Sequence, residues 1–482
     1  MKDKDYISFD SDKQHDNAEQ LKKQLKTDKI KKRMHIARIS VFFSVFLAIA
    51  GGLIVFERPT VSEIENRNLT PMPEYSRNDL ISGKYTDGIT EYYNDTVPFR
   101  SLFKDVSATF KDMLGIKVEG IKIHSIKKPV DNNEGNEPEV TTVTTTLPPV
   151  TEPVVTDVTQ STDTTDTTTT PVTTPTPPPI TEPEVPTPPE DNGMLSNNIM
   201  IYKNRGIPIY YGSMDAGSQY AAYVNNYKAD LGDSVNVYSM VCPTVMSFYW
   251  PEGSRVSHGS EAENLENIRQ HLVGVNDVNI LPILDEHKNE HIYSRTDHHW
   301  QALGAYYACK TFTEVAGVNF APLSSYARVV EKGYVGTLYG YSGDITLKNN
   351  PEEFAYYAPS NEYHTDYYSK NFDFLYSGSM LTEAYGSSLY CTFLGGDEYV
   401  AHIGTDQHNG RTLMIIKDSY GNALPPFLTN SFENIYVVDM RYFQRNAIQF
   451  ARDQGVTDIL FAMNTFSATG GNYKKLEKLR TQ

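Results

Sequence analysis

The chain has 482 residues, of which 39% are hydrophobic, and it carries a formal net charge of −17 at pH 7. Proteins that bind nucleic acid concentrate positive charge on one face, so this acidic balance argues against nucleic acid as a partner. Three cysteines are too few for a disulfide framework in a chain of this length, which leaves an apolar core to stabilise the fold.

The first feature along the chain is a basic segment followed by an apolar one. Residues 1–38 form a polar tail whose second half is rich in lysine and arginine, and residues 39–56 are uncharged and mostly apolar. An apolar run of this length can cross a bilayer core of about 30 Å as a helix. Because basic residues stay on the cytoplasmic side, we expect a single-pass cell-membrane protein with a cytoplasmic N-terminus and an extracellular C-terminal domain. A cleaved signal peptide is the alternative, but its charged region would be unusually long.

Two segments of different character follow the expected transmembrane anchor. In residues 57–127, the apolar residues between Phe99 and Leu114 recur at helical spacing, which predicts a packed helix. Residues 128–192 are dominated by threonine and proline, with acidic residues and no lysine or arginine from residue 131 to 191. Such a stretch buries too little apolar surface to offset its chain entropy. We therefore expect a disordered linker that is open to O-glycosylation.

Globular composition returns in residues 193–482, where strand-like apolar runs are followed by helical patterns. The strand-like runs are residues 235–242, 278–284, 411–419, 434–440 and 457–464, and the helical patterns include residues 263–275, the segment after 300, and 446–455. This alternation predicts an α/β domain with a mostly parallel sheet that helices cover on both faces. Ligands of such sheets bind outside the carboxyl ends of the strands, where we expect the functional residues.

The sequence IIKDSYGN places a serine at one such strand end. An apolar run ends at Lys417 and delivers Ser419 to a turn that contains Gly421. A serine in a strand-to-helix turn is exposed as a nucleophile, and nearby backbone N–H groups can hold an oxyanion. A helix cap formed by Asp418 and Ser419 is the structural alternative.

The sequence RTDHHW offers partners for that serine. Asp297 and His299 lie two residues apart, just before a predicted helix, so both can approach the same side. The carboxylate can accept the Nδ1 proton of His299, which leaves Nε2 to take the proton of a serine. An N-capping aspartate flanked by hydrogen-bonded histidines is the alternative.

The two motifs together resemble those of DHHW proteins in the SGNH-hydrolase-like superfamily, which is related to the alginate O-acetylation proteins. Supporting matches are SEIENRNL at 62–69, EYYNDTVPFR at 91–100, VCPT at 241–244, GYVGTLYGYSGD at 333–344 and IYVVDMRYF at 435–443. The resemblance implies a flavodoxin-like SGNH sheet covered by helices. It also implies that Asp297 orients His299, that His299 is the base, that Ser419 is the nucleophile, and that His298 supports them.

The linker is where this chain departs from the family pattern, because it separates residues 57–127 from the main domain. Residues 57–127 either dock on the core domain or form a separate stalk, and the matches at 62–69 and 91–100 favour docking.

Donors to an oxyanion are harder to identify from the sequence. The backbone N–H groups of Ser419 and Tyr420 are natural candidates, and Asn422, Arg441 and Asn464 follow predicted strands. Turn or capping roles are the alternative for each of these side chains.

Two further patterns suggest other ligands. The HKNEH sequence at 287–291 matches a zinc-peptidase pattern, but it lacks a third ligand and a proven helix, so we expect neither a metal nor a cofactor. Tyrosines crowd residues 354–399, and exposed tyrosine rings can stack on sugars. Packing inside the protein explains most of them equally well.

These features predict a membrane-anchored extracytoplasmic O-acyltransferase that acetylates a cell-envelope or exopolysaccharide glycan through an acyl-Ser419 intermediate. A carbohydrate esterase with the same triad, or a non-catalytic glycan-binding or envelope assembly protein, is the alternative. The expected partners are a glycan acceptor, the lipid bilayer through residues 39–56, and a membrane-bound O-acyltransferase that supplies acyl groups.

Overall fold

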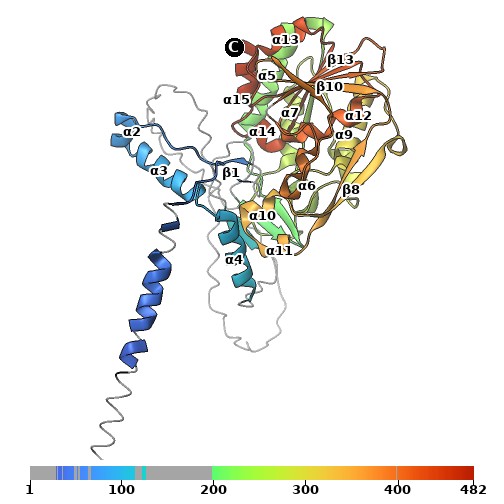
Figure 1. Cartoon of the computed structure of the whole chain (residues 1–482). Coiled ribbons are helices and arrows are strands. Elements are labelled where there is room, and N and C mark those ends of the chain that lie inside the picture. The colour runs from blue at the N-terminus through green and yellow to red at the C-terminus, as the bar shows by residue number, and fades with distance from the viewer. Residues whose placement is uncertain are drawn as a thin grey trace, which may run out of the picture.

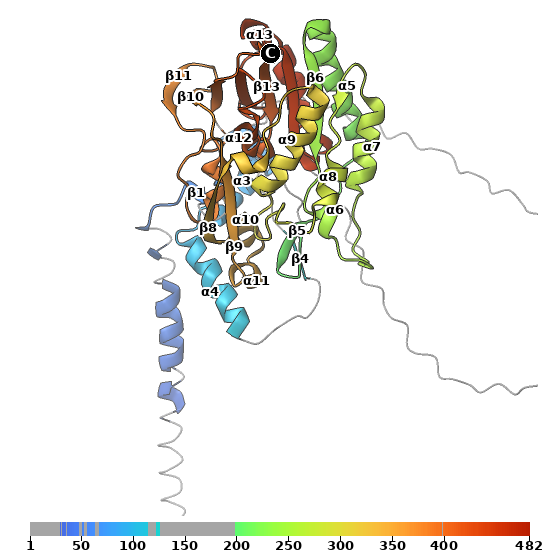
Figure 2. The ribbon, with the colours of Figure 1, turned by 90° about the vertical axis from the view of Figure 1, so that its right-hand side faces the viewer.

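The computed structural model describes residues 29, 31–34, 36–47, 51–52, 55–62, 67–113, 122–125, 198–397 and 399–482. The expected linker at 128–192 lies outside this description, as do most of the basic tail and residues 48–50, 53 and 54 of the expected transmembrane anchor. Residues 36–47 are helical and project away from the rest of the molecule in Figures 1 and 2. Among the residues that the structure describes, no helix is both long and apolar enough to cross a membrane.

A mixed eight-stranded sheet forms the centre of the molecule, with the strand order β11-β10-β12-β14-β13-β15-β6-β7. Its strands are β6 (Asn236–Cys242), β7 (Asn276–Asp277), β10 (Tyr363–Tyr368), β11 (Phe374–Gly378), β12 (Val400–Thr405), β13 (Thr412–Lys417), β14 (Asn434–Asp439) and β15 (Asp458–Asn464). The neighbours from β14 to β7 pair in parallel, and β12, β10 and β11 extend the sheet in antiparallel pairs. The predicted α/β fold is thus confirmed, with an antiparallel extension that was not expected.

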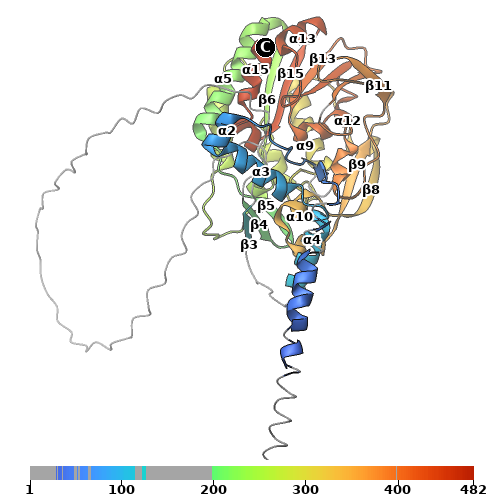
Figure 3. The same ribbon diagram turned by 60° about the vertical axis from the view of Figure 1, so that its left-hand side comes forward.

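Helices cover both faces of this sheet (Figure 3). One face packs against α5 (Met214–Leu231), α7 (Glu261–His271), α13 (Ala447–Asp453), α14 (Thr465–Thr469) and α15 (Lys474–Thr481). The other packs against α6 (Met246–Tyr249), α8 (Leu281–Glu286), α9 (Ala302–Ala316) and α12 (Pro425–Leu428). Every residue of β13 and β15 is buried between these layers, which is why their sequences are almost continuously apolar.

The strand predicted at residues 278–284 is wrong. The structure has only the two-residue β7 before this run, and α8 begins at Leu281. Pro282 lies in the first turn of α8, where its missing N–H costs no helical hydrogen bond. Ile280 and Leu284 are nevertheless buried, so the apolar run still contributes to the core.

Segments on either side of the linker meet in a small sheet. Strand β3 (Lys122–Ser125) pairs antiparallel with β4 (Asn198–Tyr202), which pairs with β5 (Arg205–Pro208). Before β3 come β1 (Val61–Ser62), β2 (Arg67–Asn68), α2 (Arg77–Ser82), α3 (Lys84–Asp95) and α4 (Arg100–Met113). Residues 57–127 therefore contact the part of the chain that follows the linker.

Helix α4 forms where the apolar spacing predicts it, but its apolar side does not pack on the core. Lys104 Nζ donates to the carbonyl of Gly340 at 2.7 Å, and the hydroxyl of Tyr339 donates to Asp105 Oδ1 at 2.6 Å. Both partners belong to α10 (Thr337–Ser342). The apolar side chains are 47–61% exposed, namely Phe99, Leu102, Phe103, Val106 and Phe110.

Candidate active site

Ser419 lies immediately beyond the carboxyl end of β13, as the first residue of the 3-10 helix η4 (Ser419–Ala423). Asp418 caps this turn, because its Oδ1 accepts from Tyr420 N at 2.9 Å and its Oδ2 from Asn464 N at 3.0 Å. A Cβ at Gly421 would lie 2.4 Å from Lys417 Cβ, so the tight turn requires glycine. The capping role therefore belongs to Asp418, which leaves the Ser419 hydroxyl available for other contacts.

The structure brings Asp297 and His299 to Ser419 across 120 residues of sequence. His299 Nε2 lies 2.8 Å from Ser419 Oγ, and His299 Nδ1 lies 2.6 Å from Asp297 Oδ1. With a proton on Nδ1 held by the carboxylate, Nε2 carries the lone pair that accepts the serine proton. Both motifs thus come together in the geometry of a nucleophile, a base and an orienting acid.

Asp297 is held from its other side by α10. Its Oδ2 accepts from the backbone N–H and the hydroxyl of Thr337, both at 2.8 Å. A Cβ at Gly336 would lie 2.4 Å from Asp297 Cβ, so glycine lets the two segments approach. Burial alone would raise the pKa of Asp297, but His298, His299 and these hydrogen bonds outweigh it and hold that pKa well below its usual range.

His298 supports this arrangement without touching Ser419. Its Nδ1 donates to Thr337 Oγ1 at 2.9 Å, which turns the Thr337 hydroxyl towards Asp297. Burial, followed by repulsion from His299, lowers the pKa of His298 to about 3. His298 is consequently neutral at physiological pH.

Tyr390 is a site residue that the sequence does not reveal. Its ring stacks on the imidazole of His299 with centroids 3.7 Å apart and planes 3° apart. Its hydroxyl donates to the carbonyls of Ser419 at 3.0 Å and Tyr420 at 3.3 Å. Tyr390 belongs to the 3-10 helix η3 (Gly386–Thr392), and only its place in a tyrosine-rich region hinted at a role.

One of the predicted oxyanion donors, Tyr420, is engaged elsewhere, and the side-chain oxygen of another, Asn464, caps a helix. Tyr420 N–H donates to the Asp418 cap, and the Tyr420 hydroxyl donates to the carbonyl of His298 at 2.6 Å. Asn464 Oδ1 accepts from Ser467 N at 2.9 Å and caps α14. Of the two backbone donors proposed, the Ser419 N–H is the one that the Asp418 side chain does not engage.

The other two candidates, Asn422 and Arg441, lie in a charged network beside Ser419. Asn422 Nδ2 donates to Asp397 Oδ1 at 2.7 Å, and Asn422 Oδ1 is buried without a hydrogen-bond partner. Arg441 binds Asp397 at 2.8 Å and makes a bidentate pair with Asp439. Burial alone would raise the pKa of Asp397, but Arg441 and the buried Lys417 outweigh it and hold that pKa well below its usual range.

The HKNEH segment does not gather metal ligands. Helix α8 ends at Glu286, before the motif, so the two histidines do not share a helical face. His287 Nδ1 contacts Glu290 at 2.6 Å, whereas His291 Nε2 contacts Glu352 at 2.8 Å. Glu352 also accepts from Arg295 N and Thr296 N, so it holds the chain just before Asp297.

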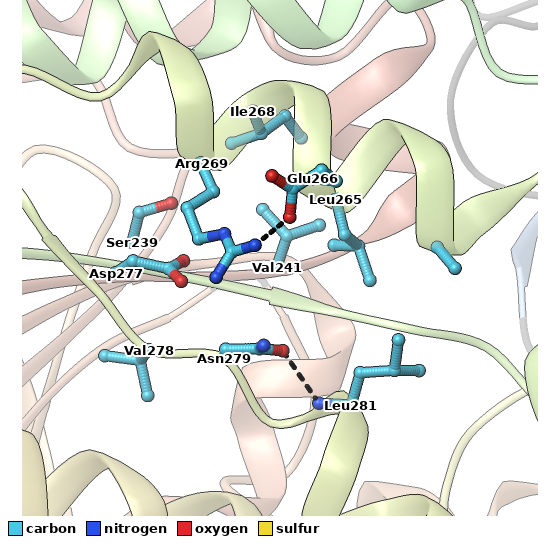
Figure 4. Close-up of a pocket in the computed structure, with 11 residues that line it drawn as sticks. Ser239, Val241, Leu265, Glu266, Ile268, Arg269, Asp277, Val278, Asn279 and Leu281 are labelled. Atoms are coloured by element: carbon cyan, nitrogen blue, oxygen red, sulfur yellow. Dashed lines mark hydrogen bonds and ion pairs between the residues drawn. The ribbon is translucent and has the colours of Figure 1, made fainter.

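A separate pocket of about 80 Å³ lies between α7 and the β6–β7 edge (Figure 4). The ion pair of Arg269 with Glu266 and the side chains of Asp277 and Asn279 line it. None of its lining residues belongs to the Ser419 site, and the hydroxyl of its serine, Ser239, shares a hydrogen bond with the hydroxyl of Tyr220 at 3.0 Å.

Comparisons with known proteins agree with this geometry. A family model described as DHHW protein matches residues 195–438. The solved structure of a DHHW family protein from Eubacterium siraeum is 41% identical with a TM-score of 0.56, and the match covers 60% of this chain and 98% of that one. Bacillus cereus PatB1, solved with a sulfonyl adduct, shares the fold at 18% identity and a TM-score of 0.50, covering 57% of this chain and 97% of that one. A comparison with curated proteins gave no match.

The family model spans about half of the chain and contains the DHHW sequence at 297–300 as well as Ser419. The Eubacterium siraeum protein, at 41% identity, is also a DHHW family protein. This chain belongs to the DHHW protein family.

Proposed function

We propose that the protein is an O-acyltransferase that transfers an acyl group, most simply acetyl, through a covalent intermediate on Ser419. The observation that carries this proposal is the unbroken hydrogen-bond chain from Asp297 through His299 to Ser419 Oγ. A serine becomes a strong nucleophile only beside a base that is itself oriented, and all three elements are present.

The reaction follows from the positions of the atoms. Ser419 Oγ attacks the carbonyl carbon of the acyl donor and passes its proton to His299 Nε2, while Asp297 stabilises the imidazolium. In this proposal the Ser419 N–H donates to the developing oxyanion, and the leaving group departs with the proton from His299. An acceptor hydroxyl then gives its proton to His299 and attacks the acyl carbon, which releases the new ester and restores the serine. Water as the acceptor would make the same site an esterase.

The acceptor in this proposal is a glycan of the cell envelope or an exopolysaccharide. Tyrosines on the surface support it, because Tyr376, Tyr385 and Tyr399 are 39–75% exposed. Tyr376 also stacks on the buried Tyr367 at 4.9 Å, which holds its ring in place. Fixed, exposed aromatic rings suit the apolar faces of sugars.

We also propose the location of the enzyme. Residues 1–38 would be cytoplasmic, residues 39–56 would anchor the chain in the cell membrane, and residues 57–127, the linker at 128–192 and the catalytic domain at 193–482 would lie outside. The basic residues before position 39 support this orientation. Because acetyl donors are cytosolic, a membrane-bound O-acyltransferase would have to export the acyl group to Ser419.

The acyl-enzyme is the decisive test. The full-length protein in lipid nanodiscs is incubated with 4-nitrophenyl acetate and digested for mass spectrometry. We expect one acetyl group on the peptide that contains Ser419, no acetylation in Ser419→Ala or His299→Ala, and acylation slowed by about four orders of magnitude in Asp297→Asn. An arylsulfonyl fluoride provides a second covalent probe, since PatB1 has been solved with a sulfonyl adduct.

The exposed Ser234 supplies the matched control, since Ser234→Ala should acylate as the wild type does. Thermal unfolding shows whether each variant keeps its fold. A folded wild type that no activated ester or sulfonyl fluoride labels would overturn the catalytic proposal and favour a non-catalytic envelope protein. Mass spectrometry of glycan oligomers then separates transfer, which adds acetyl groups, from hydrolysis, which removes them.

A further inference from the structure

Two adjacent strands carry a cluster of metal-ligand side chains away from Ser419. His364 and Asp366 lie on β10 and His402 lies on β12, and one ligand atom from each lies within 4.8 Å of the others. Asp366 and His402 are paired directly across the antiparallel strands. His364 and Asp366 are two residues apart on one strand, so they share a face of the sheet. We propose that these three side chains bind a divalent transition metal, with zinc as the best match.

Two of the three ligands have partners that orient them for metal binding. His402 Nε2 donates to Asn434 Oδ1 at 3.0 Å, which leaves the lone pair on Nδ1 for a metal. The hydroxyl of Ser377 donates to Asp366 Oδ1 at 2.6 Å and fixes that carboxylate. Hydrogen bonds of this kind set the tautomer and direction of metal ligands in proteins.

The strand opposite His364 leaves space for its ring. His364 pairs with Gly404, and a Cβ at Gly404 would lie 2.1 Å from Cε1 of the imidazole. Any other residue at this position would displace the ring from the cluster. The second imidazole, that of His402, is stacked on Tyr436 with centroids 4.4 Å apart. Both histidines thus occupy defined positions.

The ligand set selects the type of ion. Two imidazoles and one carboxylate are typical of zinc sites that keep a further position for water, whereas calcium and magnesium prefer oxygen ligands alone. Ligand atoms of a tetrahedral zinc ion lie about 3.3 Å apart, so small side-chain rotations would close the cluster around the metal. His364 is exposed and the other two are half-buried, which gives ions in solution access to the site.

The site is separate from the catalytic turn and does not rest on the proposed function. The two sites lie at opposite ends of β14. Asn434, which contacts His402, is the first residue of this strand, and Asp439, which pairs with Lys417 near Ser419, is the last. Figure 2 shows β10 and β11 at the outer edge of the sheet. A metal ion held by β10 and β12 would tie this edge to the rest of the sheet and stabilise it.

Metal binding is measured on the full-length protein in nanodiscs after chelator treatment. Zinc is titrated calorimetrically, and cobalt is added separately to record the visible spectrum of the coordinated ion. We expect one zinc ion per chain, a rise in Tm with zinc, and an intense tetrahedral cobalt spectrum. His402→Gln, His364→Ala and Asp366→Asn should each weaken zinc binding by at least about 10-fold and remove the cobalt spectrum.

Two control variants test the other histidine-rich segments. His287→Ala removes a histidine of the HKNEH segment, and His298→Ala disrupts the Asp297, His298 and His299 group. Both should bind zinc as the wild type does. Zinc binding that survives the strand substitutions, is lost in either control, or does not occur in the wild type would overturn the proposal. Circular dichroism distinguishes lost ligation from lost folding, and acylation of Ser419 is scored independently.

Discussion

The carboxylate of Asp397 is placed between two cations, Lys417 and Arg441, beside the amide of Asn422. Lys417 is 1% exposed, so its charge depends on Asp397 and Asp439 for compensation. Removing one partner from such a network leaves a buried charge without its counterion, which costs more free energy than the intact pair contributes. Asp397 therefore links the stability of the fold to the neighbourhood of Ser419.

Replacing Asp397 with asparagine should lower the free energy of unfolding at pH 7 by about 3 kcal/mol, the low end for such pairs, because this side chain is 24% exposed. The folded-state pKa of Asp397 lies below its unfolded value of about 3.9. Its stabilising contribution is thus complete above pH 4 and is lost as the pH falls through the folded pKa. The difference between wild type and Asp397→Asn should accordingly narrow below pH 4 in denaturant titrations.

The control for this experiment is Asp233→Asn, since the Asp233 side chain is fully exposed. Its free energy of unfolding should stay within about 0.5 kcal/mol of the wild type at every pH. A gap between wild type and Asp397→Asn that stays constant down to pH 2 would contradict the ionised network.

For single residues, the sequence predicts those members of the site that belong to a short local motif. Asp297 and His299 are two residues apart, and Ser419 follows an apolar strand, so local patterns identify all three. Thr337 contacts Asp297, which is 40 residues away in the sequence, and Tyr390 contacts Ser419, which is 29 residues away. No local spacing encodes such contacts, which only the packing of the whole domain creates.

Among the elements, η3 covers the imidazole of His299 with a single side chain, that of Tyr390. Tyr390 is buried, and both its ring and its hydroxyl contact the site. The stacked ring restricts the orientation of His299, and the hydrogen bonds fix η3 to the turn that carries Ser419. Tyr390 is therefore a positioning residue in the proposed reaction.

Tyr390→Phe keeps the ring and loses the hydrogen bonds, so the acylation rate of Ser419 should fall about 5-fold to 10-fold. Tyr390→Leu also removes the stacked ring and should lower the rate by about another factor of 10. Release of 4-nitrophenol in the first turnover reports this rate. Tyr385 precedes η3 and is 75% exposed, so Tyr385→Phe and Tyr385→Leu should react at the wild-type rate. A folded Tyr390→Leu variant with unchanged acylation would exclude the positioning role.

The sequence predicts some of the strands and helices and misses others, for physical reasons. Strands β6, β13, β14 and β15 are buried on both faces, and their continuous apolar sequences identify them. Strand β10 is rich in tyrosine and only partly buried, and β11 is exposed along its whole length, so neither has the apolar pattern of a core strand. The run at 278–284 has the composition of a strand, but α8 begins at Leu281 and Pro282 lies in its first turn.

In the whole molecule, the exposed apolar side of α4 begins next to the segment that leads to the N-terminal helix. The ring of Phe56, the last residue of the expected anchor, lies edge-on to Phe99 with centroids 4.9 Å apart. Arg58 then donates to Thr96 Oγ1 at 3.1 Å and lies over the ring of Tyr93. These contacts fix the start of α4 at the end of the anchor, and so at the membrane surface if residues 39–56 span the bilayer as proposed.

The contacts that hold α4 and β3 against the main domain come from residues outside the linker. Strands β3 and β4 pair across it, and α4 binds α10 through Lys104 and Asp105. The sequence predicted the apolar spacing of α4, but not that its polar side would face the protein. An apolar helical face that is turned away from the protein core and lies next to the proposed membrane anchor is suited to the interface of a bilayer.

We therefore expect the apolar side of α4 to insert about 5–10 Å into the membrane interface. Phe110→Trp places a fluorophore on that side, where Phe110 is 61% exposed. In nanodiscs that contain brominated lipids, its fluorescence should be quenched more strongly by bromine near the headgroups than by bromine at the bilayer centre. Lys478→Trp is the matched control, because Lys478 is exposed on α15, which lies far from the N-terminal helix in Figures 1 and 3. Equal quenching of the two variants would show that α4 faces water, and its apolar side would then need a protein partner.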